Sequence, residues 1–170
     1  RRFLAGDASD RSYDRLTRPG QTAVLMNAPP GMGDNPAVFL KIAAHLSKLG
    51  LSAPLCIAQD LNHGFLLLED LGDGIYAQIV AETPSIEPIL YTAAADALLH
   101  IQSHNSPTHL PNLTARDWAE AACFALDWYR FAITGDHVDP QPMRDILTDL
   151  IHRYADGPRV MILRDFHAEN

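Results

Sequence analysis

The chain contains few cysteines and no long hydrophobic run. Its 170 residues include two cysteines, Cys56 and Cys123, which form neither a disulfide framework nor the paired spacing of a zinc site. No apolar stretch approaches the roughly 20 residues that a helix needs to cross a bilayer, so we expect no membrane partner. The start of the chain also lacks the features of a signal peptide. These absences predict a reduced, cytoplasmic protein.

Basic residues are a minority among the charged ones. Lys and Arg number 13 against 21 Asp and Glu, which gives a formal net charge of −8. Nucleic-acid-binding proteins present a basic face to the phosphate backbone, so we expect no nucleic-acid partner. The acidic composition does not exclude a nucleotide ligand, because Mg²⁺ and local amide groups offset phosphate charge in an acidic protein.

Two features are missing at the ends of the chain. It begins with Arg1 and Arg2 rather than an initiator methionine, and no segment follows Asn170. We therefore expect that these residues belong to a longer parent protein.

Short apolar or alternating segments dominate the first third of the chain and predict strands. They are residues 2–5, 13–17, 23–26, 55–58 and 65–68. One helix is predicted between the third and the fourth of these strands. Asn35 can cap its start, Pro36 suits its first turn and Gly50 favours its end.

From about residue 71 the pattern changes to helical periodicity. The predicted helices cover residues 75–80, 86–101, 114–133 and 139–154, the third opened by a capping box of Thr114 and Asp117. The apolar run 160–163 predicts a final strand. This order predicts an α+β fold with a sheet-rich lobe at residues 1–70 and a helical lobe at residues 71–170.

The last eight residues carry a pattern with chemical meaning. The apolar run leads into Arg164 and Asp165, and Asn170 follows the Asp at +5. Phosphoryl transfer of the kinase type uses one carboxylate to orient and deprotonate a hydroxyl and one amide oxygen to hold Mg²⁺. The alternative interpretation is a surface Arg-Asp pair followed by an incidental Asn.

Four stretches together resemble a known superfamily. They are residues 4–13 (LAGDASDRSY), 24–30 (VLMNAPP), 67–72 (LLEDLG) and 163–170 (LRDFHAEN). At this spacing they are similar to the nucleotide loop, third strand, hinge and catalytic loop of the protein-kinase-like superfamily. Within it, the chain resembles the aminoglycoside phosphotransferase and choline kinase branch. The nearest resemblance is to bacterial kinases that phosphorylate N-acetylmuramate and N-acetylglucosamine at the anomeric hydroxyl.

The resemblance implies a protein-kinase-like two-lobed fold with an antiparallel sheet in the N-terminal lobe and a C-terminal lobe that is incomplete here. It implies that ATP and Mg²⁺ bind between the lobes, with Asp165 as the catalytic base and Asn170 as a metal ligand. The implied nucleotide-binding residues are Gly6, Asp7, Ala8, Ser9, Arg11, Glu69 and Leu71. Locally, residues 6–9 also suit an ordinary hairpin turn and residues 69–72 an ordinary strand end.

The chain departs from the superfamily at three positions. The usual phosphate-binding Lys of the third strand is replaced by Met26, and residues 37–50 contain no acidic partner for it. The His two residues before the catalytic Asp is Leu163. Phosphate positioning would then fall to loop amides, Mg²⁺ and Arg11 or Arg15.

The implied reaction transfers the γ-phosphoryl group of ATP to a hydroxyl of a small molecule. An amino sugar is the expected acceptor, as in cell-wall sugar recycling. Two alternatives stay open at this point. The first is an aminoglycoside antibiotic phosphotransferase, and the second is a nucleotide-binding pseudokinase or scaffold, which the replacement of Lys by Met26 supports.

Five other side chains have two interpretations each. His100 and His104 lie four apart on a predicted helix, and a capping role is favoured over a metal site because no third ligand is evident. His167 either lines the acceptor site or is a passive loop residue. Trp128 and Tyr129 either stack on a sugar or belong to a helical core stripe.

Overall fold

A computed structural model describes residues 1–6, 10–32, 35–155 and 157–169 of the chain. These residues form two compact units. The first comprises residues 1–104 and 162–170, and the second comprises residues 105–161. The lobe boundary near residue 70 stays a prediction.

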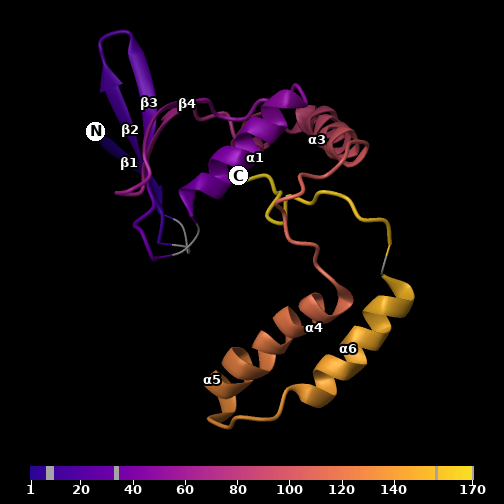
Figure 1. The fold of residues 1–170 in the computed structure, drawn as a ribbon. Helices are drawn as coiled ribbons and strands as arrows, with labels where there is room; N and C mark the ends of the chain where they lie inside the picture. Colours follow the sequence, from indigo (N-terminus) through magenta and orange to yellow (C-terminus); the bar gives the residue numbers. More distant parts are fainter. Residues whose placement is uncertain (7–9, 33–34, 156, 170) are drawn as a thin grey trace. The chain divides into compact units, whose positions relative to one another are not determined.

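The first unit contains a five-stranded antiparallel sheet in the order β1-β2-β3-β5-β4 (Figure 1). The strands are β1 (Arg2–Gly6), β2 (Ser12–Arg18), β3 (Gln21–Asn27), β4 (Cys56–Asp60) and β5 (Phe65–Glu69). All five predicted strands are confirmed, and the described residues agree with an antiparallel sheet followed by helices.

One face of this sheet carries the core of the first unit. Met26 pairs with Tyr13 on one side and with Leu66 on the other, so the three side chains form a row across β2, β3 and β5. The fully or nearly buried cluster is Met26, Ala28, Leu66 and Leu68. Helix α1 (Pro36–Lys48) packs Phe39 and Leu40 against it. Burial of this apolar surface is the main driving force that joins the helix to the sheet.

Helix α1 begins and ends where its local sequence predicts. The Asn35 side chain accepts a 2.8 Å hydrogen bond from the Ala37 N–H, and Pro36 occupies the first turn. Gly50 follows the helix with a φ of 78°. Both ends therefore use the predicted cap and stop residues.

The turn between β4 and β5 touches the core through a glycine. The Ala28 N–H donates a 2.8 Å hydrogen bond to the Gly64 carbonyl. A Cβ atom on Gly64 would lie 1.9 Å from the Ala28 carbonyl oxygen, and Gly64 has a φ of 77°. This position therefore needs both the small size and the conformational freedom of glycine.

Three helical segments complete the first unit, namely α2 (Tyr76–Glu82), the 3₁₀ helix η1 (Pro84–Ile86) and α3 (Glu87–Gln102). His100 Nε2 lies 2.8 Å from the Leu49 carbonyl at the end of α1, and His104 Nδ1 lies 2.7 Å from the His100 carbonyl. These contacts agree with the capping role. No helix in the described part of the chain has the length and apolar character of a membrane span.

The second unit is helical. Thr114 and Asp117 form the predicted capping box at the start of α4 (Ala115–Phe124). A π-helix, η2 (Ala125–Arg130), and α5 (Phe131–Thr134) follow directly, so the predicted single helix is three segments. Trp128 and Tyr129 lie on the π-helical turn and are exposed, which contradicts their interpretation as a core stripe.

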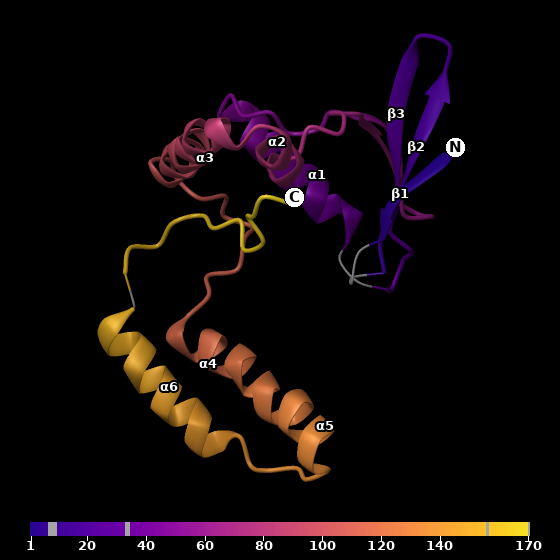
Figure 2. The ribbon, with the colours of Figure 1, turned by 180° about the vertical axis from the view of Figure 1, so that it is seen from behind.

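Helices α4 and α6 (Gln141–Tyr154) pack side by side within the second unit (Figure 2). The buried residues of α4 have a spacing of four and small side chains, which permit close packing; they are Ala115, Ala119 and Cys123. Arg144 pairs with Glu120 across the two helices. The apolar face of α6 is wider than this contact, since Ile146, Leu150 and Tyr154 are exposed.

The predicted strand at residues 160–163 is wrong. These residues have no regular secondary structure. A strand needs the backbone groups of a neighbouring strand, and residues 160–163 pair with none of the five described strands. An apolar run alone is therefore not sufficient for a strand here.

Candidate active site

The end of β5 is bonded to the neighbouring chain at Leu55 through both the backbone and the side chain of Glu69. The Glu69 N–H donates a 2.8 Å hydrogen bond to the Leu55 carbonyl, and the Leu55 N–H donates a 3.1 Å hydrogen bond to Glu69 Oε2. The Glu69 carboxylate is thus engaged with the chain beside it. Any ligand contact of this segment is expected to use backbone groups, as the hinge interpretation requires.

A pocket of about 250 Å³ lies against this segment. Its apolar walls include Leu4 of β1, Val24 of β3 and Leu68 of β5, and residues 69–72 form one side. Both predicted hinge residues, Glu69 and Leu71, line it. Apolar walls beside backbone donors and acceptors suit a flat ring with a polar edge, such as a nucleobase.

Arg15 lines the same pocket, but its guanidinium is paired with two carboxylates. It contacts Asp70 and Asp73, which follow β5. Hydrogen bonds from Arg15 hold the pKa of each carboxyl below its ordinary value, and the same bonds raise the pKa of Arg15. The suggestion that Arg15 positions phosphate is therefore not supported.

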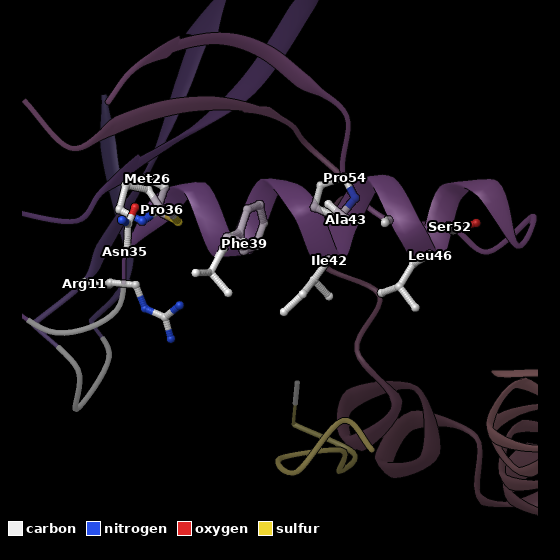
Figure 3. A pocket seen from close by; sticks show the side chains of 12 residues that line it. Arg11, Met26, Asn35, Pro36, Phe39, Ile42, Ala43, Leu46, Ser52 and Pro54 are labelled. Atoms are coloured by element: carbon white, nitrogen blue, oxygen red, sulfur yellow. The ribbon is translucent and has the colours of Figure 1, made fainter. Parts of the chain in front are cut away.

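A larger pocket of about 350 Å³ lies beside α1 and shares Phe39 and Pro54 with the smaller one. Figure 3 shows Ile42 and Leu46 projecting from the same side of α1, with the Arg11 guanidinium near the start of the helix at Asn35. Arg11 thus supplies a positive charge to an otherwise largely apolar pocket.

Met26 is the residue predicted to replace the superfamily's Lys. It lines the larger pocket, is fully buried and packs in the core cluster that Phe39 of α1 touches. An apolar contact thus joins β3 to α1 where the superfamily uses an ion pair. The absence of an acidic residue on α1 agrees with this replacement, because a buried Lys would have no partner there.

The predicted nucleotide loop is described at its two ends. Gly6 is the last residue of β1 and pairs with Ser12 of β2. Arg11 is half-buried. Asp7, Ala8 and Ser9 lie outside the described residues, and their predicted contacts with phosphate stay predictions.

The predicted catalytic loop contains a tight turn with unusual backbone geometry. The Asp165 N–H donates a 2.8 Å hydrogen bond to the Leu163 carbonyl, around Arg164 with a φ of 63°. An i to i+2 hydrogen bond around a residue of positive φ defines a γ-turn of the strained type. Such strain is concentrated at functional sites, and here it precedes the exposed carboxylate of Asp165.

His167 contacts the Asp165 carboxylate. The Glu169 N–H donates a 3.2 Å hydrogen bond to His167 Nδ1, and His167 Nε2 lies 3.3 Å from Asp165 Oδ1. Because Nδ1 accepts, the neutral ring carries its proton on Nε2, which can then donate to the carboxylate. His167 is thus placed to orient Asp165, a role that the sequence did not indicate.

One backbone hydrogen bond joins this loop to the segment after the hinge. The Ala77 N–H in the first turn of α2 donates to the Ala168 carbonyl at 2.9 Å. Ile75, the residue that caps α2, makes no side-chain cap bond, so the loop carbonyl satisfies one of the free N–H groups at this helix end. The smaller pocket, which lies against residues 69–72, and the Asp165 loop therefore belong to the same compact unit.

The predicted metal ligand is Asn170. The described residues contain no group of three or more His, Cys, Asp or Glu side chains that could hold a metal ion. Kinase-type sites need fewer protein ligands, because Mg²⁺ keeps waters and phosphate oxygens. Asn170 lies outside the described residues and stays a predicted ligand.

Comparisons with known proteins indicate the family of the chain. A family model described as "Phosphotransferase enzyme family" matches residues 1–170. An N-acetylmuramate/N-acetylglucosamine kinase of Caulobacter vibrioides is 32% identical and covers 100% of the chain. Proteins of the same name from Pseudomonas aeruginosa and Pseudomonas putida are 32% and 30% identical, and each covers 98% of the chain.

The chain spans about half the length of these curated relatives, namely 57% of the Caulobacter protein and 49% of each Pseudomonas protein. The family match nevertheless runs from the first strand to the Asp165 loop. The sheet, the hinge pocket and the strained loop all lie within the matched residues. On this evidence the chain belongs to the phosphotransferase enzyme family.

Proposed function

We propose that the full-length protein is an ATP-dependent kinase that phosphorylates a hydroxyl of an amino sugar. One observation carries the proposal: three relatives named N-acetylmuramate/N-acetylglucosamine kinase match 98–100% of the chain at 30–32% identity. Because the chain spans about half of each relative, the activity is assigned to the complete protein. The two free cysteines support the proposal that it acts in a reducing, cytoplasmic compartment.

The nucleotide site is proposed to lie on the α1-facing side of the sheet. The base would occupy the smaller pocket, against Leu4 and Val24 and beside the backbone of Glu69 and Leu71. The phosphates would extend toward Gly6 and Arg11, where the Arg11 guanidinium offsets their charge. This direction agrees with the fact that Arg15 is already paired with Asp70 and Asp73.

Asp165 is proposed to orient the acceptor hydroxyl and to receive its proton. The γ-turn at Arg164 exposes its carboxylate, and His167 Nε2 restrains one of its oxygens. Phosphoryl transfer passes through a loose transition state, so positioning of the hydroxyl contributes more than proton removal. When bound, Mg²⁺ neutralises charge on the nucleotide phosphates, and Asn170 is the residue of this chain predicted to hold it.

The test uses the full-length protein with ATP-Mg²⁺ and a panel of acceptors. N-acetylmuramate and N-acetylglucosamine are expected to be phosphorylated, whereas aminoglycosides are not. Asp165→Asn is expected to lower kcat by about 10²- to 10⁴-fold, the usual contribution of a positioned base. Its affinity for ATP, measured by calorimetry, should match that of the wild type.

Asp149→Asn is the matched control, because Asp149 is an exposed carboxylate that pairs with Arg153 on α6. It should leave kcat unchanged. Phosphorylation of aminoglycosides but not of amino sugars would overturn the acceptor class. ATP binding without any transfer by the complete wild-type protein would instead identify a pseudokinase.

A further inference from the structure

Arg15 joins strand β2 to the hinge through a cluster of charges. Its Nε lies 2.7 Å from Asp70 Oδ2, and its Nη2 lies 3.0 Å from Asp70 Oδ1. Nη1 and Nη2 each lie 2.8 Å from an oxygen of Asp73. All three guanidinium nitrogens therefore contact carboxylates. The Arg15 and Asp70 side chains are 13% and 6% exposed, whereas that of Asp73 is 66% exposed.

The path of the Arg15 side chain is fixed by the strand register. Arg15 pairs with Val24 on β3, and Val24 pairs with Leu68 on β5. The three residues thus form one row on the same face of the sheet. To reach Asp70, which follows β5, the guanidinium must cross β3 beside Val24, where the smaller pocket lies.

Asp70 lies between the two residues whose backbone groups are predicted to bind the base. Its Oδ1 also accepts a 3.0 Å hydrogen bond from the Gly72 N–H, which closes a turn around Leu71. On the other side, Glu69 is bonded to Leu55 at its amide and its carboxylate. Residues 69–72 are therefore fixed by Leu55 at one end and by Arg15 at the other.

We propose that Arg15 is a positioning residue for nucleotide binding, which sets the path of residues 69–72 through its ion pairs with Asp70 and Asp73. The inference rests on the proposed function, because it assumes that the nucleobase occupies the smaller pocket. Charge-assisted hydrogen bonds from one guanidinium fix geometry as well as charge, and Arg15 donates one to Asp70 and one to Asp73. Low exposure of Arg15 and Asp70 strengthens the pair relative to a surface pair.

The experiment measures the affinity of the full-length protein for adenosine, ADP and ATP-Mg²⁺, together with kcat and both KM values. Arg15→Met is expected to weaken all three ligands by a similar factor of about tenfold, since the base is common to all of them. The KM for the amino sugar should stay within about twofold of wild type. A contact between Arg15 and phosphate would instead give a loss that grows from adenosine to ATP, and this result would overturn the inference.

Further variants separate positioning from folding. Asp70→Asn should reproduce the effect, and the double variant with Arg15→Met should be no weaker than either alone, because both remove one interaction. Asp73→Asn removes the exposed partner and should give a smaller loss in a stably folded protein. Arg18→Met is the matched control, since Arg18 is an exposed residue of the same strand whose bond to Gln21 lies away from the hinge.

Two outcomes distinguish this inference from the proposed function. A wild-type protein that binds ATP and phosphorylates the sugar, with unchanged nucleotide affinity in folded Arg15→Met and Asp70→Asn variants, overturns the inference alone. A wild-type protein that binds no nucleotide overturns both. Equal losses in the nucleotide KM, the sugar KM and kcat would show a general structural role, which also contradicts the inference.

Discussion

The Ala77 N–H donates a 2.9 Å hydrogen bond to the Ala168 carbonyl, so the first turn of α2 holds the loop that carries Asp165. This contact joins two segments that lie far apart in the sequence. One follows the hinge and the other contains the predicted base. Its removal should therefore affect the orientation of the loop without affecting the nucleobase pocket.

Ala77→Pro removes this donor, and proline is tolerated in the first turn of a helix. We expect kcat for sugar phosphorylation to fall by about threefold to tenfold, which corresponds to the loss of one hydrogen bond of ordinary strength. The Kd for ATP should not change. Gln78→Pro is the control, because it places proline in the same turn at an exposed position and keeps the Ala77 N–H. Equal kcat values for the two variants would contradict the prediction.

The two nitrogens of His167 can be tested separately. His167→Gln places a side-chain amide donor near Asp165, whereas His167→Asn retains an acceptor for the Glu169 N–H and loses the reach to Asp165. If the ring positions Asp165 through Nε2, the Gln variant should retain about tenfold more kcat than the Asn variant, with similar KM values for ATP. Steady-state kinetics of both variants measure this difference. Equal losses in kcat would show that the bond to Glu169 is the important one.

Restoring the superfamily's Lys at position 26 should destabilise the protein. Met26 is fully buried and α1 has no acidic residue to pair with a cation. Met26→Lys is expected to lower the free energy of unfolding by about 3 kcal/mol or more, as an unpaired buried charge does. Met26→Leu keeps the volume and should cost less than about 1.5 kcal/mol. Urea denaturation of both variants provides the comparison, and similar midpoints would show that the Lys finds a partner.

Substitutions at two glycines with the same backbone conformation can distinguish the cost of backbone strain from the cost of a steric clash. Gly20 and Gly64 have φ values of 75° and 77°, but a Cβ on Gly20 meets no described atom within 4 Å, whereas one on Gly64 meets the Ala28 carbonyl oxygen. Gly20→Ala should destabilise the fold by about 1–2 kcal/mol, the cost of a left-handed conformation. Gly64→Ala should cost more than about 3 kcal/mol, because the clash adds to this strain. Thermal unfolding of the two variants measures the difference, which would vanish if the turn shifted freely.

Local signals in the sequence were sufficient for most of the fold. The start of α1 depends on Asn35 and Pro36, which are adjacent, and the start of α4 depends on Thr114 and Asp117, three residues apart. Such interactions form within one helical turn, so their residues identify them directly. The five strands were equally evident from their apolar or alternating residues.

Features that depend on distant or subtle interactions were not evident. A strand at residues 160–163 was wrong because pairing, rather than apolar character, decides whether a strand forms. The π-helical turn at Ala125–Arg130 has no distinct sequence signature that separates it from an α-helix. Arg15 and Asp70 are 55 residues apart, and only the strand register brings them together.

Within the candidate site, the sequence predicted residue roles, which stay predictions, but not the contacts that surround these residues. Asp165 was indicated by the Arg-Asp pair after an apolar run, and Glu69 and Leu71 line a pocket as the hinge interpretation requires. The bond from His167 to Asp165 depends on the fold of the loop, in particular on the γ-turn at Arg164. Arg has no preference for positive φ, so the residue type at position 164 gives no indication of this turn.

The hinge cluster of Arg15, Asp70 and Asp73 contains more carboxylates than guanidinium groups. One guanidinium faces two carboxylates; Asp70 lines the pocket proposed for the base, and the Asp73 side chain is 66% exposed. A triphosphate that enters in the reverse direction would be repelled by Asp73. We therefore expect the hinge end of the pocket proposed for the base to disfavour an anion, so a bound nucleotide would direct its phosphates away from Asp73.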